Sequence, residues 1–212
     1  GNYFDNYFNY SLDYDLRNKR FRPDEGFRNT FGQELPLVSD NYEIVNSFET
    51  TRYQKISEMV TKISFYGKAV NTLSNDDVRI SKRLFMPSSK LRGFEAGKIG
   101  PVDNNDYIGG NYVSALNFSA TLPTLFPSFQ NMDFSIFVDA ANLWGVAYDG
   151  TIDDSDKIRR STGMAMDLLT PVGPLNFSLS QPITKSSTDT VSYTHLRAHE
   201  TDSYLVCRLL LE

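Results

Sequence analysis

Apolar and polar residues alternate along much of the chain, and turn-forming residues separate the alternating stretches. In the first stretch, about residues 8–17, apolar residues hold every second position and polar residues fill the positions between them. Alternation with a period of two is typical of a β-strand and does not fit the apolar stripe of a helix. The apolar set of this stretch is Phe8, Tyr10, Leu12, Tyr14 and Leu16.

The same pattern predicts further strands after this one, for a total of about eight. Clusters of Gly, Asn, Asp and Pro separate them, which favours consecutive strands joined by turns in an antiparallel meander. The expected strands cover residues 27–38, 42–54, 57–70, 112–122, 134–144, 162–170 and 175–183. We therefore expect an all-β fold, although alternation is poor in residues 42–54.

Residues 71–110 interrupt the series, because no strand alternation is present there. Connections of this length are uncommon in compact domains and are usually functional or disordered. The long connection therefore becomes the first candidate for a functional segment.

The strand lengths, the outward aromatic residues and the many consecutive meander strands favour a membrane barrel over a soluble sandwich. No run approaches the roughly 18 apolar residues of a membrane helix, but a membrane barrel alternates lipid-facing and lumen-facing residues and keeps a low mean hydropathy. The 12 Tyr and 15 Phe suit a membrane interface. Alternation alone leaves open which face is inside, and a sandwich would bury the large apolar set. The net charge of −5, with acids and bases mixed, argues against a nucleic-acid partner.

Several short motifs occur in a fixed order around the long connection. In this order and spacing they resemble the C-terminal half of the BamA superfamily barrel, over roughly residues 5–188. The motifs are Leu91-Arg92-Gly93-Phe94, Ile99-Gly100-Pro101, Gly109-Gly110, the stretch from Phe137 to Trp144, and Leu169-Thr170-Pro171-Val172-Gly173-Pro174-Leu175.

The resemblance implies a sixteen-stranded antiparallel transmembrane barrel in the outer membrane of a diderm bacterium. Residues 1–190 would be a fragment that holds most of its C-terminal half, and residues 71–110 would fold into the lumen. The resemblance also implies that Gly100, Pro101, Gly109, Gly110, Gly173 and Pro174 lie at turns or at the start of strands.

Within the loop, the resemblance implies that Arg92 meets an acid on the inner wall, which maps to Asp139. A guanidinium in a confined lumen needs a carboxylate and can bind it through two hydrogen bonds. Gly93 permits a backbone bend or a close approach. Relatives carry a second wall acid where this chain has Ser119, so we expect a simple pair. Asp106, in the same loop, is the alternative partner for Arg92.

The function implied by the resemblance is the folding and insertion of other outer-membrane proteins by strand addition at a lateral seam. The expected partners are unfolded outer-membrane proteins, accessory assembly lipoproteins and membrane lipid, without cofactor or enzymatic activity. Two alternatives remain. One is a two-partner-secretion or TamA-like translocation pore. The other is a small passive pore or structural barrel, since about eight strands can close a barrel.

Residues 191–212 change character and contain both histidines and the only cysteine of the chain. The string resembles translated sequencing-adapter DNA, and we expect it to be a non-native tail. His195, His199, Glu200 and Cys207 suggest zinc ligands, but no catalytic Glu follows the first His as in H-E-x-x-H. Residues 153–156 are acidic but lack the spacing and Gly of an EF-hand. We expect no metal site at either place.

Overall fold

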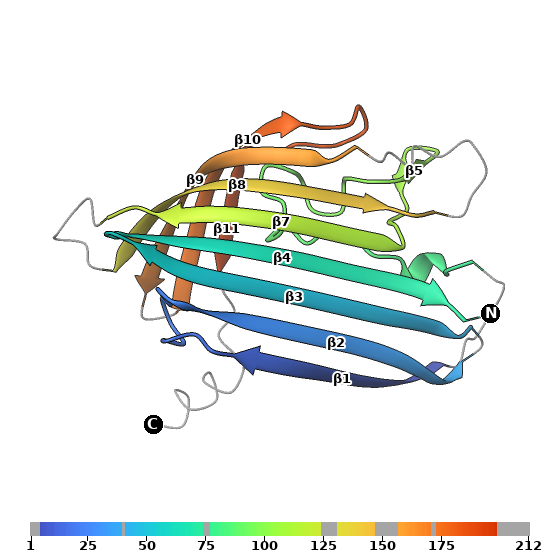
Figure 1. Cartoon of the computed structure of the whole chain (residues 1–212). Coiled ribbons are helices and arrows are strands. Elements are labelled where there is room, and N and C mark those ends of the chain that lie inside the picture. The colour runs from blue at the N-terminus through green and yellow to red at the C-terminus, as the bar shows by residue number, and fades with distance from the viewer. Residues whose placement is uncertain are drawn as a thin grey trace, which may run out of the picture.

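The structure is a computed structural model that describes residues 5–39, 41–73, 77–123, 131–146, 157–170 and 173–198. Its main sheet is antiparallel, with nine strands in the order β1-β2-β3-β4-β7-β8-β9-β10-β11 (Figure 1). The strands are β1 (Asp5–Asp15), β2 (Gly26–Ser39), β3 (Glu43–Ile56), β4 (Met59–Thr72), β7 (Tyr112–Thr121), β8 (Met132–Trp144), β9 (Arg159–Thr170), β10 (Gly173–Thr184) and β11 (Thr194–Ala198). The predicted all-β antiparallel meander is confirmed.

The ninth strand, β11, lies in the residues that we expected to be a non-native tail. Its five residues pair with β10, from Leu179 opposite Thr194 to Leu175 opposite Ala198. The strands β1 and β11 are the two ends of the described sheet, so these residues form a strongly curved but open wall.

The start of β9 lies before the position predicted from alternation. It begins at Arg159, and Arg159 and Ser161 pair with Ala141 and Asp139 of β8. Both side chains are fully buried although they are polar. Apolar periodicity could not detect this part of the strand, because its inward positions carry no apolar residue.

The connection between β4 and β7 lies within the curve of the sheet (Figure 1). It contains the 3-10 turn Ile80–Lys82 and a small hairpin of β5 (Val102–Asp103) and β6 (Asp106–Tyr107). The sequence did not predict this hairpin, because each strand has only two residues. In the part of the chain that the structure describes, no helix is long and apolar enough to cross a membrane.

Large apolar side chains are exposed on one face of the sheet, which argues against a soluble sandwich. Examples are Phe8, Leu12, Ile63, Leu116, Ile136, Met164 and Leu179. The opposite face carries buried polar residues such as Glu43, Ser64, Asn117, Asp139 and Ser161. This arrangement fits a lipid-facing exterior and a polar lumen.

The buried apolar core lies between the long connection and the inner face of β4, β7 and β8. The connection contributes Val78, Leu84, Met86, Leu91, Phe94 and Ile99. The wall contributes Val70, Val113, Ala115, Ala141 and Leu143. The connection therefore packs on the sheet as a second layer and is not a detached surface loop.

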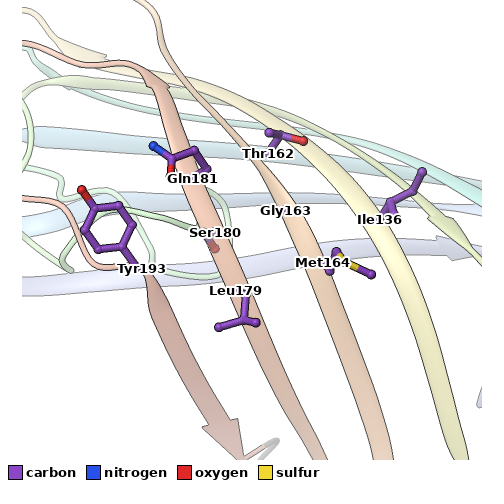
Figure 2. A pocket seen from close by; sticks show the side chains of 8 residues that line it. All are labelled: Ile136, Thr162, Gly163, Met164, Leu179, Ser180, Gln181 and Tyr193. Carbon is purple, nitrogen blue, oxygen red and sulfur yellow. The ribbon is translucent and has the colours of Figure 1, made fainter.

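A shallow pocket of about 600 Å³ lies across β8, β9 and β10. Figure 2 shows that Ile136, Met164 and Leu179 come from three neighbouring strands of this region. All three side chains are exposed, whereas Asp139 on the opposite face of β8 is fully buried. These three side chains therefore place the pocket on the apolar outer face.

Candidate functional site

Arg92, from the long connection, forms a bidentate ion pair with Asp139 of β8. Its Nε donates to Oδ2 at 2.8 Å and its Nη2 donates to Oδ1 at 2.7 Å. The backbone N–H of Arg92 also donates to Oδ2, at 3.1 Å. The Asp139 side chain is fully buried and that of Arg92 is 17% exposed. The structure thus brings together the two residues that the resemblance paired.

Phe137 supports the guanidinium from the same strand. The guanidinium carbon of Arg92 lies 3.4 Å from the centroid of the Phe137 ring, within the range of a cation–π interaction. Phe137 is paired in register with Gly163 of β9, which Figure 2 labels between Thr162 and Met164. A Cβ atom on Gly163 would lie 2.7 Å from Cζ of Phe137. The missing side chain therefore leaves room for the ring on which Arg92 stacks.

The wall residue beside Asp139 is Asn117 of β7 and not Ser119, the position expected from the sequence. Asn117 is opposite Asp139 in the register, whereas Ser119 is opposite Phe137. The Nδ2 of Asn117 donates to Asp139 Oδ1 at 2.9 Å and to the carbonyl oxygen of Lys90 at 2.8 Å. The ion pair therefore has a third, uncharged member, which links the wall to the loop.

The alternative partner of Arg92, Asp106, lies on β6 and is exposed. None of the hydrogen bonds or ion pairs described for Arg92 involves Asp106. The geometry thus places Arg92 against the sheet and not against its own loop.

Gly93 brings the tip of the loop close to the wall formed by β9 and β10. Its φ is +91°, a conformation that residues with a side chain rarely adopt. A Cβ atom there would lie 3.2 Å from Cβ of Ser180 and 3.3 Å from Cβ of Ser161. On either side, Leu91 and Phe94 are 1% and 2% exposed and belong to the core. In this motif, Arg92 therefore contacts β8 and Gly93 contacts β9 and β10. Leu91 and Phe94 pack in the core.

Gly100 makes a second close approach, to Leu143 of β8. Its φ is +98°, and a Cβ atom there would lie 2.5 Å from Cδ2 of Leu143. The following residue, Pro101, is fully buried. The Ile99-Gly100-Pro101 motif is thus a turn pressed against the inner wall.

The remaining glycines of the motifs lie at the start of strands. Gly110 bonds to Leu84 in both directions, with N···O distances of 2.8 and 2.9 Å, and β7 begins shortly after it. Gly109 and Gly173 have φ values of +73° and +126°. Gly173 begins β10 and is followed there by Pro174.

Three further cations of the loop meet acids of the wall, which the sequence did not predict. Arg79 donates its backbone N–H to Oε1 of Glu43 at 2.9 Å. Its Nη2 lies 3.2 Å from Oε2 of Glu43 and 3.0 Å from Oδ2 of Asp5. Burial lowers the pKa of Arg79, but the hydrogen bonds and charges of Glu43 and Asp5 outweigh burial, so the pKa is raised.

Lys82 and Lys90 continue this row of pairs. Nζ of Lys82 lies 2.8 Å from Oε1 of Glu34 on β2, and Nζ of Lys90 bonds to Oε1 of Glu49 on β3. The loop therefore meets β1, β2, β3 and β8 through opposite charges. The pairs could not be read from the sequence, because the partners are far apart along it.

Metal-ligating residues are not clustered in the part of the chain that the structure describes. His195 lies on β11, where its Nε2 accepts a hydrogen bond from the backbone N–H of Gly93 at 3.0 Å. The other residues of the suggested zinc set, His199, Glu200 and Cys207, lie outside the described residues, as do the acidic residues 153–156. The described site holds the loop against the inner face of the sheet.

Comparisons with known proteins identify relatives of this chain. An outer membrane protein assembly factor, BamA of Neisseria meningitidis serogroup B, is 30% identical over 132 residues, which cover 48% of this chain and 16% of that protein. The crystal structure of BamA from Haemophilus ducreyi lacking POTRA domains 1–3 has the same fold. Its TM-score is 0.82 at 23% identity, over 90% of this chain and 41% of that chain.

The chain thus spans less than half the length of either relative. The described strands form part of a β-barrel of the Gram-negative outer membrane. The family model that describes the Omp85 superfamily domain matches residues 1–198. The chain therefore belongs to the Omp85 superfamily.

Proposed function

We propose that this chain is part of the barrel of an assembly factor that folds and inserts other outer-membrane proteins by strand addition at a lateral seam. The expected partners are unfolded outer-membrane proteins, accessory assembly lipoproteins and the lipid around the barrel. The observation that carries the proposal is the loop seated on the inner face by Arg92 and Asp139. The name of the Neisseria relative supports the same role.

Strand addition needs a sheet edge with a defined geometry, since main-chain hydrogen bonds supply the affinity. The seated loop provides this geometry by acting as an internal brace. It joins strands far apart in the sheet, from Asp5 on β1 to Asp139 on β8. Displacing the loop would free the strands to change their relative curvature.

The Arg92–Asp139 pair is the part of the brace most sensitive to substitution. Removing one partner of a buried ion pair costs roughly 3–5 kcal/mol, because the other charge stays buried and unpaired. Asp139 is fully buried and would lose the guanidinium that binds it through two hydrogen bonds, while Asn117 would remain as a donor. We expect the loop to leave its seat before the sheet unfolds.

The test uses the full-length protein in cells depleted of the wild-type copy. We expect Arg92→Ala to lower the levels of many outer-membrane proteins and to expose the loop to protease. The matched control is Arg28→Ala, which removes an exposed bidentate pair with Asp13 between β1 and β2. If the Arg92→Ala protein assembled outer-membrane proteins at the wild-type level, the proposal that the loop is an internal brace would be wrong. Loss of one exported protein with normal assembly of the others would favour a secretion pore.

A further inference from the structure

Arg159 and Asp189 form a further ion pair on the inner face, and both side chains are fully buried. Nε of Arg159 lies 3.0 Å from Oδ2 of Asp189, and its Nη2 donates to Oδ1 at 3.0 Å. Nη1 donates to Oδ1 of Asn142 on β8 at 2.7 Å. The backbone N–H of Ser186 donates to Oδ2 of Asp189. Groups from β8, β9 and the chain after β10 therefore form hydrogen bonds within this buried cluster.

A pair buried this deeply is weak evidence for stability, since removing two charges from water offsets much of their attraction. Its geometric effect is clearer. A bidentate contact fixes the position and orientation of the carboxylate. Here it holds Asp189, and with it residues 185–190, against the start of β9. We call residues 185–190 the strap.

The strap lies across the long connection just after its Arg92 motif. The backbone N–H of Glu95 donates to the carbonyl oxygen of Thr190 at 3.0 Å, and the N–H of Thr190 donates to the carbonyl oxygen of Lys98 at 3.1 Å. The hydroxyl of Tyr107 donates to the carbonyl oxygen of Thr188 and lies 3.2 Å from Oγ1 of Thr190. The strap therefore bonds to two separate parts of the loop.

These contacts form a continuous chain from the wall to the loop tip. Asp189 is held by Arg159, the adjacent Thr190 pairs with residues 95 and 98, and Glu95 directly follows the motif that carries Arg92. All strap residues precede Val191, so the chain of contacts does not involve the segment that resembles adapter sequence.

We infer that Arg159 and Asp189 are positioning residues that seat the strap and, through it, the loop that carries Arg92. The strap is then an anchor of the loop on β9, in addition to Asp139 on β8 and the ion pairs with β1, β2 and β3. Because the strap directly follows β10, a displacement of the chain after β10 is transmitted to the loop tip. The functional meaning of this transmitted displacement rests on the proposed function. The positioning of the loop by the strap does not.

The experiment measures the distance between strap and loop in the full-length protein. Lys98 and Thr190 are replaced by cysteine, because the backbone N–H of Thr190 donates to the carbonyl oxygen of Lys98 at 3.1 Å and the two residues therefore lie side by side. We expect rapid cross-linking in the otherwise wild-type protein. Asp189→Asn keeps the shape of the side chain and removes its charge, and it should slow cross-linking at least about fivefold. The control is Asp13→Asn, which removes the acid of the exposed pair with Arg28.

A second readout separates positioning from general destabilisation. Trypsin cleavage after Lys90 or Arg92 reports whether the loop tip is seated. Asp189→Asn should expose these sites, and a preformed disulfide between residues 98 and 190 should protect them again. We expect the disulfide to restore protection of the loop tip only if Arg159 and Asp189 act through the strap.

If Asp189→Asn is folded and keeps wild-type cross-linking and loop protection, the inference is overturned. If it does not fold, Arg159→Met with Asp189→Leu replaces both charges by apolar groups, an exchange that buried ion pairs often tolerate. A folded double variant with wild-type cross-linking would also overturn the inference. A protein that shows the predicted cross-linking but assembles no outer-membrane proteins would refute only the proposed function.

Discussion

The guanidinium of Arg92 is stacked on the ring of Phe137, with 3.4 Å between its central carbon and the ring centroid. The same guanidinium donates two hydrogen bonds to Asp139, two residues further along β8. Alternate residues of a strand face the same side, so one short stretch of β8 supplies both the acid and the aromatic surface. The site therefore selects for a planar cation.

Arg92→Lys should behave more like Arg92→Ala than like the wild type. An ammonium keeps the charge but loses the two-pronged hydrogen bonding and the stacked plane. We expect a loss of about 2 kcal/mol in the stability of the seated loop. The protection of the loop from protease in the full-length protein measures this loss of stability. Full protection of the lysine variant would show that charge alone suffices.

Gly163→Ala should destabilise the protein although the substitution is small. A Cβ atom there would lie 2.0 Å from the carbonyl oxygen of Leu179 and 2.7 Å from the Phe137 ring. Overpacking of this kind costs roughly 1–3 kcal/mol. The matched control is Gly67→Ala on β4, where the nearest contact would be 3.4 Å from the Phe65 ring. Equal urea midpoints for the two variants would contradict the steric argument.

Asn117→Ala should loosen the loop, and Ser119→Ala should not. Asn117 donates to both Asp139 and the Lys90 carbonyl, whereas none of the side-chain hydrogen bonds of the described residues involves Ser119. Leaving a buried acceptor without its donor costs about 1–3 kcal/mol. Thermal unfolding of the two variants distinguishes the positions, and a larger effect at Ser119 would refute the assignment.

Glu43→Gln should destabilise the protein far more than Glu34→Gln. Glu43 is fully buried beside Arg79, and the substitution removes one of the two carboxylates that pair with this guanidinium. Breaking such a buried pair costs roughly 3–5 kcal/mol. Lys82 and Glu34 are 27% and 28% exposed, and a pair open to solvent contributes at most about 1 kcal/mol. Similar unfolding midpoints for Glu43→Gln and Glu34→Gln would show that the buried pair does not contribute more than the exposed one.

Independent long-read sequencing of the locus should return a different sequence for residues 191–212. The expectation rests on the string from Val191 onward, which resembles adapter-derived DNA, although Thr194–Ala198 pair with β10 in the structure. Recovery of the same codons from fresh genomic DNA would show instead that the segment is genuine.

Alternation predicted the strands well where one face is apolar, as in residues 8–17 and 175–183. It failed at Arg159, where both faces of the strand are polar. The pairing of Arg92 with Asp139 came from a family resemblance, and spacing alone would not have suggested it. Asn117 and Gly163 were missed because their roles depend on strand register, which fixes the residue that lies opposite.

The row of ion pairs between loop and wall has an electrical consequence. The loop brings the positive charges, from Arg79, Lys82, Lys90 and Arg92, and the strands bring the negative ones. With the loop seated, the two sets neutralise each other locally. With the loop withdrawn, a strip of carboxylates would line the passage and attract cations. The ion selectivity of single channels in a planar bilayer would then report, in real time, whether the loop is in its seat.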